Sequence, residues 1–307
     1  MGPLRIKEDR DVKSQLLCIP CTVRAAYDIA VKATENEALR RRIVYETLRW
    51  LSERENLLRE PPPKLHTYVQ RLTRRITGNP DPFKDLKRRS NEVALRVIRV
   101  LKRRCQEAGF TDAFRLAALG TICGNAIDFE VEGHEVSMSR LEDDLRSCLD
   151  SSLAVDDTSK FMDLLKNSRR LLYLLDNAGE IVFDKFLIQM IRSKYSARIF
   201  AAVKSKPVLN DATLEDAEQV GLDETAEVIA TGNDHIGVNL DESSEEFLQH
   251  LREADLIIAK GQGNYESITE IEDSLSKPIV YMLKAKCILI AESLGVQQYD
   301  NVVKVVT

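Results

Sequence analysis

Apolar residues in the first half of the chain recur at intervals of three and four positions, which is the spacing of one face of an α-helix. This pattern extends from about Cys18 to Leu149. It is interrupted at Pro61–Pro63, at Gly78–Pro82 and at Gly109, where proline or glycine ends a helix or forms a turn. We therefore predict that the first half consists of several helices joined by turns.

The pattern changes after a small, polar segment at Asp150–Ser159. Beyond it, short apolar runs alternate with helical stretches, as in a mostly parallel sheet covered by helices on both faces. The runs predicted as strands are Leu171–Leu175, Arg198–Val203, Glu227–Ala230, Asp255–Ala259, Pro278–Leu283 and Val302–Val306. We expect a helical cap domain at residues 1–155, followed at residues 156–307 by a doubly wound α/β/α domain that binds metal and phosphate.

The composition is typical of a soluble globular protein. Of the 307 residues, 44% are hydrophobic and 30% are charged, and no apolar run approaches the roughly 20 residues that span a membrane. Among the six cysteines only Cys18 and Cys21 are close in sequence, so we expect no disulfide framework. These features predict a cytoplasmic protein without a membrane partner.

The charge distribution is uneven, although the net charge is only -5. Basic clusters gather in the first half, at Arg40–Arg42, Arg74–Arg75, Lys87–Arg89 and Lys102–Arg104. They alternate with apolar residues at helical intervals, which is typical of solvated helix faces. The aromatic fraction of 6% also argues against a protein that stacks the bases of single strands. We therefore expect no nucleic-acid partner.

Polar side chains follow several predicted strands, at the edge where ligands bind in open parallel sheets. Asp176 and Asn177 follow the first strand, and Asp211 lies beyond the second. Singly, such residues are typical helix caps. Together they offer hard oxygen ligands, so we predict one divalent metal ion, Mg²⁺, Mn²⁺, Co²⁺ or Ni²⁺.

Basic residues and glycines at the same edge indicate phosphate binding. Lys204 and Lys260 end two strands, where an ammonium can neutralise a phosphate dianion. Gly261 and Gly263 would let backbone N–H groups approach an anion at a helix N-terminus. A surface lysine and an ordinary glycine turn are the structural alternatives.

Several other enzyme classes are disfavoured by motifs that the sequence lacks. The dinucleotide-binding, P-loop, α/β-hydrolase and zincin signatures are absent. Asp176 is followed by Asn177 and Ala178, so a haloacid-dehalogenase mechanism would lack its second acid.

Ordered blocks over nearly the whole chain make it similar to the metal-dependent damage-control phosphatases, also called domain of unknown function eighty-nine, and above all to their archaeal branch. The blocks are Cys18–Cys21, Thr77–Phe83, Lys87–Asn91, Gly124–Phe129, Asp176–Glu180, Pro207–Thr213 and Lys260–Asn264. The resemblance implies a helical domain on an α/β/α domain, with Asp176, Asn177 and Asp211 as metal ligands. It also implies hydrolysis of small phosphorylated metabolites, such as sugar phosphates or phosphopantetheine derivatives.

These residues suggest a mechanism in which the metal orients water against the substrate phosphate. Either Asp176 or Asp211 would accept the proton of the water, and Lys260 would bind a phosphate oxygen instead of a neighbouring carboxylate. The other predicted contacts to substrate, phosphate or metal-bound water are Glu180, Lys204, Gly261, Gly263, Asn264, and Asn125 and Asp128 from the cap side.

Two alternative functions, and the role of two cysteines, remain open from the sequence. An S-adenosylmethionine-dependent protein carboxyl methyltransferase would need an adenosine pocket, for which Gly179 gives thin support. A non-catalytic metabolite-binding protein is compatible with the same fold. Cys18 and Cys21 lie three positions apart, and they can be a redox pair, part of a metal site or two small core residues.

Overall fold

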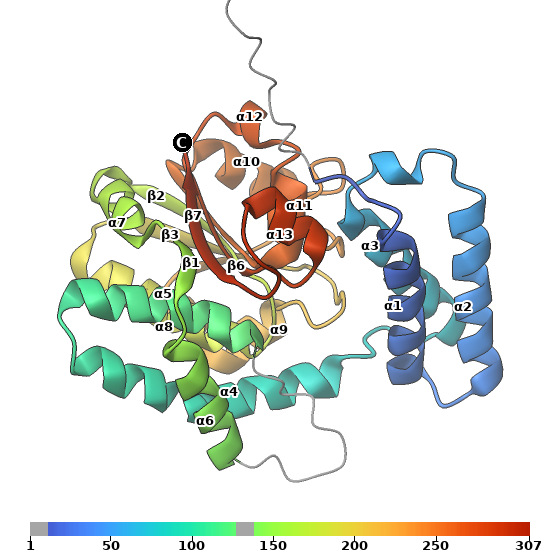
Figure 1. Cartoon of the computed structure of the whole chain (residues 1–307), viewed down its shortest axis with the longest axis horizontal. Helices are drawn as coiled ribbons and strands as arrows, with labels where there is room; N and C mark the ends of the chain where they lie inside the picture. Colours follow the sequence, from blue (N-terminus) through green and yellow to red (C-terminus); the bar gives the residue numbers. More distant parts are fainter. Residues whose placement is uncertain (1–11, 127–137) are drawn as a thin grey trace, which may run out of the picture.

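The computed structural model describes residues 12–126 and 138–307. Figure 1 shows a lobe of helices beside a larger body that is built around one β-sheet. The lobe contains α1 (Cys18–Ala33), α2 (Glu37–Ser52), the short helix η1 (Leu57–Arg59) and α3 (Pro62–Thr77). The long helix α4 (Lys84–Gln106) extends from the lobe along the body.

Local signals define the helices of the lobe. The Asn36 side chain accepts hydrogen bonds from the first backbone N–H groups of α2, and a proline begins α3, where its missing N–H costs nothing. Gly78 ends α3 with a φ of 71°, a left-handed conformation that glycine adopts without strain. The buried faces meet in a small core of Ala26, Ile29, Ala30, Ile43, Val69 and Phe83.

The other helices of the first half pack on the sheet-containing body. They are α4, α5 (Phe110–Ala126) and α6 (Met138–Leu149). A β-carbon at Gly124 of α5 would lie 2.7 Å from the Phe183 ring of α8 (Glu180–Lys194), so glycine permits the close contact between these two helices. One hydrophobic core includes residues from α4 to α6 and from the sheet, and it therefore continues across residue 155. The division of the chain at that residue stays a prediction.

The sheet has seven strands in the order β1-β7-β6-β5-β2-β3-β4. From β6 to β4 all neighbours are parallel, whereas β7 is antiparallel to β6 and parallel to β1. The strands are β1 (Leu153–Asp156), β2 (Arg170–Leu174), β3 (Arg198–Val203), β4 (Glu227–Ala230), β5 (Leu256–Lys260), β6 (Ile279–Lys284) and β7 (Asn301–Val306). The six predicted strands are confirmed, each to within one residue at either end.

Helices cover both faces of this sheet. Leu171 and Tyr173 of β2 belong to the core shared with α5 and α8, whereas Leu172 and Leu174 belong to a second core on the opposite face. The remaining helices are α7 (Thr158–Asn167), α9 (Leu214–Val220), η2 (Leu222–Glu224), α10 (Glu245–Glu253), α11 (Gly261–Ile268), α12 (Glu272–Leu275) and α13 (Ile288–Leu294). This alternation confirms the predicted three-layer, mostly parallel α/β/α fold.

Two features of the body were not predicted. Strand β1 is only four residues long, lies within the polar segment at 150–159 and is partly exposed, so it carries little apolar signal. A disulfide joins Cys123 of α5 to Cys148 of α6. Those cysteines are 25 positions apart, so their spacing in the sequence does not mark them as a pair. The expectation of no disulfide framework therefore missed this bond.

None of the helices in the described part of the chain combines the length and apolarity needed to cross a membrane.

Candidate functional site

The loops after β2 and β3 meet through their backbones at the carboxyl edge of the sheet. The N–H of Ala178 donates to the carbonyl of Asn210 over 2.9 Å, and the N–H of Ala212 donates to the carbonyl of Asp176 over 2.8 Å. Asn177 and Asp211 thereby form an isolated antiparallel bridge. The structure thus brings together Asp176, Asn177 and Asp211, the three predicted metal ligands.

A buried side chain from α4 holds the loop after β2 in place. The Asn91 Oδ1 accepts a hydrogen bond of 2.6 Å from the N–H of Gly179, and its Nδ2 donates to Asp216 and Gln219. Lys87, one turn earlier, lies 3.4 Å from the Asp216 carboxylate. Lys87–Asn91 is one of the blocks that carry the family resemblance, but the sequence alone indicated no role for it. The i, i+4 spacing of two polar residues on an otherwise amphipathic helix was the available signal.

Gly261 lies directly against the Asp176 carboxylate. A β-carbon at this glycine would lie 1.9 Å from Asp176 Oδ2, and the φ of +77° independently favours glycine. The Asn177 Nδ2 donates to the same oxygen over 2.9 Å. Because Gly261 begins α11, the carboxylate lies near the positive end of a helix dipole. The sequence predicted an anion beside Gly261, and the anion in contact is the side chain of Asp176.

Asp211 and Lys204 are a buried pair beside this carboxylate. The Lys204 Nζ lies 3.8 Å from Asp211 Oδ2 and donates to the carbonyl of Gly237 over 2.6 Å. Burial raises the pKa of Asp211 to about 7; the Lys204 ammonium opposes this shift and the Asp176 charge adds to it. Burial likewise lowers the pKa of Lys204. Lys204 is therefore a buried residue of the site and not a surface lysine.

Lys260 lies below the loops and is completely buried. Its ammonium is ion-paired with Glu180 and lies 3.4 Å from Asp184 Oδ1, which also accepts a 2.6 Å hydrogen bond from the Tyr173 hydroxyl. Burial lowers the pKa of Lys260, but the charges of Asp184 and Glu180 outweigh this effect and raise it. The expectation that Lys260 has no carboxylate partner is therefore wrong.

The Lys260 ammonium is the shared counter-ion of the Glu180 and Asp184 carboxyl groups. Burial raises the pKa of Glu180 to about 8 despite the opposing charge of Lys260, and it raises the pKa of Asp184 as well. Among the described residues, Glu180 Oε2 has no hydrogen-bond partner. This side chain is thus buried beside Asp176 with one oxygen available, which agrees with the predicted contact to a metal-bound water.

The remaining predicted site residues either bind or pack against the backbone and side chains nearby, or lie outside the described residues. Asn264 donates from Nδ2 to the carbonyls of Leu175 and Lys260, over 3.0 and 2.8 Å, so both of its N–H groups hold the backbone. A β-carbon at Gly263 would lie 2.8 Å from the Ile236 side chain, so this glycine serves close loop packing. The side chain of Asn125 and all of Asp128 lie outside the described residues.

The loop after β4 attaches the helical lobe to the body. Asp234 forms ion pairs with Arg71 and Arg74 of α3. Arg74 also donates to the carbonyl of Pro207 over 3.0 Å, in the loop that leads to Asp211. Helix α3 is therefore anchored to two of the loops that surround the site.

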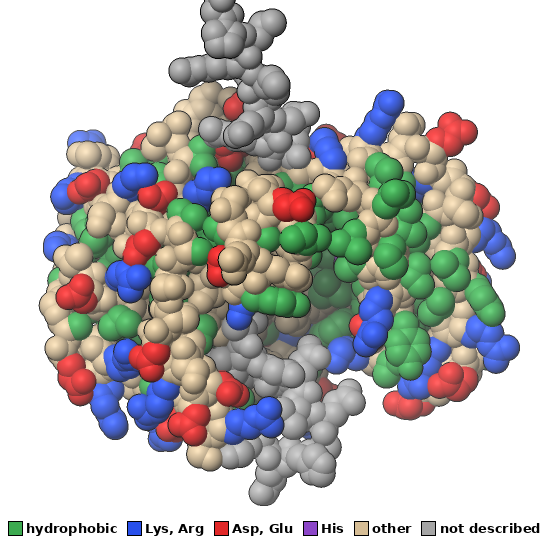
Figure 2. Space-filling model, viewed as in Figure 1, with side chains coloured by type: hydrophobic (Ala, Val, Ile, Leu, Met, Phe, Trp, Pro, Cys, Tyr) green, Lys and Arg blue, Asp and Glu red, His purple; other side chains and the backbone are tan. Residues whose placement is uncertain are grey.

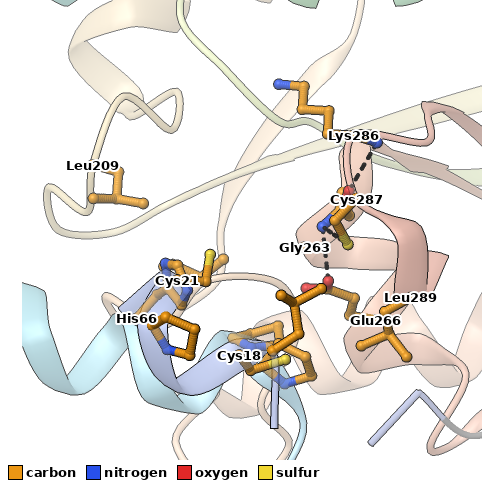
Figure 3. A pocket seen from close by; sticks show the side chains of 15 residues that line it. Cys18, Cys21, His66, Leu209, Gly263, Glu266, Lys286, Cys287 and Leu289 are labelled. Carbon is orange, nitrogen blue, oxygen red and sulfur yellow. Dashed lines mark hydrogen bonds between the residues drawn. The ribbon is translucent and has the colours of Figure 1, made fainter. Parts of the chain in front are cut away.

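A cavity of about 580 Å³ lies between the lobe and the body. Figure 2 shows hydrophobic side chains gathered around a hollow between the two parts, and Figure 3 shows Cys18, Cys21 and His66 from the lobe facing Glu266 and Cys287 from the body. Cys18 and Cys21 are free thiols and neither is fully buried. They line this cavity, so neither is a buried core residue.

The donor set at the strand ends fits a hard divalent cation. Two carboxylates and one amide converge there, and a bound cation would offset both the burial of Asp211 and the repulsion from the Asp176 charge, which together raise the pKa of Asp211. Within residues 12–126 and 138–307, no three His, Cys, Asp or Glu side chains are grouped closely enough to hold a metal by themselves. A metal here would therefore need the Asn177 amide and leave positions for water and substrate.

Comparisons with known proteins show which family the chain resembles. A family model described as the damage-control phosphatase ARMT1-like domain matches residues 15–302. The chain is 42% identical to an uncharacterized protein of Methanocaldococcus jannaschii, with 95% of each covered. It is 36% identical to a protein of Archaeoglobus fulgidus named damage-control phosphatase, with 96% of this chain and all of the relative covered. The crystal structure of a protein of domain-of-unknown-function family eighty-nine from Pyrococcus horikoshii superposes with a TM-score of 0.85 at 35% identity, covering 95% of this chain and 98% of that one.

Proposed function

The chain belongs to the damage-control phosphatase ARMT1-like family, and we propose that it is a divalent-metal-dependent phosphatase that hydrolyses phosphomonoesters of small metabolites. Sugar phosphates, phosphopantetheine-like compounds and damaged forms of such metabolites are the substrates that we expect. The observation that carries the proposal is the convergence of Asp176, Asn177 and Asp211, from two strand-end loops, into one oxygen-rich cluster.

In this proposal, Asp176, Asn177 and Asp211 hold Mg²⁺, Mn²⁺, Co²⁺ or Ni²⁺. When bound, the ion supplies charge stabilisation to the phosphoryl oxygens. Either Asp176 or Asp211 would accept the proton of the attacking water. Lys204, 3.8 Å away, compensates the negative charge of ionised Asp211.

Lys260 acts as a positioning residue in the same scheme. Its ammonium holds Glu180, the first residue of α8, beneath the loop that carries Asp176. Glu180 keeps one oxygen without a hydrogen-bond partner among the described residues, and in this scheme that oxygen would contact a metal-bound water. Loss of Lys260 would thus act on catalysis through the placement of Glu180 and the metal loop, without a direct contact to substrate.

Hydrolysis of a panel of phosphomonoesters by the purified protein tests the proposal. We expect turnover with at least one of the four metals and none after treatment with a chelator. Asp211→Asn should abolish this turnover, while Asp223→Asn, the same change at an exposed residue of η2, should leave it intact. Equal turnover with and without metal, or methyl transfer from S-adenosylmethionine in place of hydrolysis, would refute it.

A further inference from the structure

The cavity between the lobe and the body is lined mostly by apolar side chains from both parts. Leu17, Pro20 and Pro62 come from the lobe, and Leu209, Ile236 and Leu289 come from the body. Its volume of about 580 Å³ lies within the range of small-molecule pockets, roughly 300–1,000 Å³. It is thus large enough for a substantial part of a metabolite.

The cavity adjoins the predicted metal site. Leu209 lies two positions before Asp211, and Gly263 lies two positions after the glycine that contacts Asp176. A phosphate held at Asp176 and Asp211 would therefore leave its ester substituent at the opening of the cavity.

Apart from the exposed Lys286, the titratable groups of the wall are held in their neutral forms by burial, which lowers the pKa of His66 and raises that of Glu266 to about 8. The pKa values of the three thiols, Cys18, Cys21 and Cys287, are raised by burial, so these groups are neutral at pH 7. Gln262 already donates to Glu266 over 2.9 Å and accepts from the backbone N–H of Lys286 over 3.2 Å. The amide on this wall is thus bonded within the protein.

We propose that this cavity binds the organic part of the substrate, and that the preferred substrates are phosphomonoesters of largely apolar alcohols. The inference rests on the proposed phosphatase function for the position of the phosphate. Among the substrates expected above, this disfavours sugar phosphates, because their hydroxyls would lose water against the apolar part of the wall, which is costly. Each buried methylene, by contrast, favours binding about fourfold.

Steady-state kinetics with ethyl, butyl and hexyl phosphate test the proposal, with glucose 6-phosphate as the hydrated comparator. The leaving groups of the three alkyl esters are all primary alcohols, so a difference reports binding of the chain. We expect kcat/KM to rise about three- to fourfold for each added methylene, and hexyl phosphate to exceed glucose 6-phosphate. A flat series, or a preference for the sugar phosphate, would overturn the proposal.

A matched pair of variants locates the effect. Leu17 and Leu95 are exposed to similar degrees, 53% and 45%, but only Leu17 lines the cavity. Leu17→Asp places a charge at the cavity wall, and the fold should tolerate it because the side chain is largely exposed. We expect this variant to flatten the chain-length dependence and Leu95→Asp to preserve it. Equal slopes in both variants would place the apolar contact elsewhere.

Calorimetric binding of ethylphosphonate and hexylphosphonate, in the presence of Mn²⁺, separates this inference from the proposed function. Tighter binding of hexylphosphonate that Leu17→Asp removes, without turnover of any ester, would refute the phosphatase function and retain the apolar subsite. Turnover of esters together with equal binding of the two phosphonates would retain the phosphatase function and refute the subsite.

Discussion

Replacement of Lys260 by methionine distinguishes a structural ammonium from a phosphate ligand. The side chain is fully buried and its ammonium is shared by Glu180 and Asp184. Methionine keeps the length of the chain but leaves two buried carboxyl groups without a counter-ion. Removal of one partner from a buried ion pair typically costs about 3–5 kcal/mol, so we expect a loss of that size in the free energy of unfolding at pH 8.

The loss of unfolding free energy in Lys260→Met should depend on pH in one direction. Folding already raises the pKa of Glu180 to about 8, and loss of the ammonium raises it further. A carboxyl group with a raised folded pKa destabilises the fold above its unfolded pKa, about 4.3 for glutamate. Below about pH 8, Glu180 is protonated in the folded parent and in the folded variant alike, so this cost is equal in both. The contribution of Glu180 to the difference between Lys260→Met and the parent should therefore appear near pH 8, grow above it and be small at pH 5.

Urea unfolding at pH 5, 7 and 8.5 measures this difference, with Lys206→Met as the control. Lys206 is exposed, so the same change there should alter the free energy of unfolding by less than about 0.5 kcal/mol. If Lys260 were instead a phosphate ligand, its variant would unfold like the parent and lose only substrate affinity. Parent-like stability at pH 8.5 would refute the structural role of Lys260.

Three further changes probe the site and its attachment to the lobe. Gly261→Ala should abolish metal-dependent turnover, because the new methyl group would collide with the neighbouring carboxylate, while Gly109→Ala, where nothing lies within 4 Å, should leave turnover intact. Asp211→Asn should unfold in metal-free urea at the same or a higher midpoint than the parent at pH 8, since its ionised form is disfavoured by burial, and Asp223→Asn should not shift that midpoint. Asp234→Asn should speed hydrogen exchange in α1–α3 by at least tenfold, because it weakens two ion pairs to α3; unchanged exchange would mean that other contacts hold the lobe.

Much of the body could be predicted because its strands are buried on both faces. Residues 256–260 of β5 are all buried, and such runs stand out in any hydrophobic pattern. Strand β1 could not be found in this way, because half of its four residues face solvent. The antiparallel direction of β7 was equally hidden, since the direction of a strand depends on its connection and its partner.

The meeting of Asp176, Asn177 and Asp211, the proposed metal ligands, could be predicted because each follows a strand directly or through a short loop. The lysines could not be told apart in the same way. Lys204 and Lys260 both end strands, but the ammonium of one lies beside Asp211 and that of the other lies between Glu180 and Asp184. Their partners come from other elements, and no local pattern encodes such contacts. The same holds for Asn91, whose bond to Asp216 joins residues 125 positions apart.

An anomalous difference map from crystals grown with Mn²⁺ tests the central claim most directly. The account predicts a single strong peak within about 2.2 Å of oxygen atoms of Asp176, Asn177 and Asp211, and loss of this peak in Asp211→Asn but not in Asp223→Asn. A peak elsewhere on the chain, or Asp176 and Asp211 carboxylates more than about 8 Å apart, beyond the reach of one ion, would contradict it.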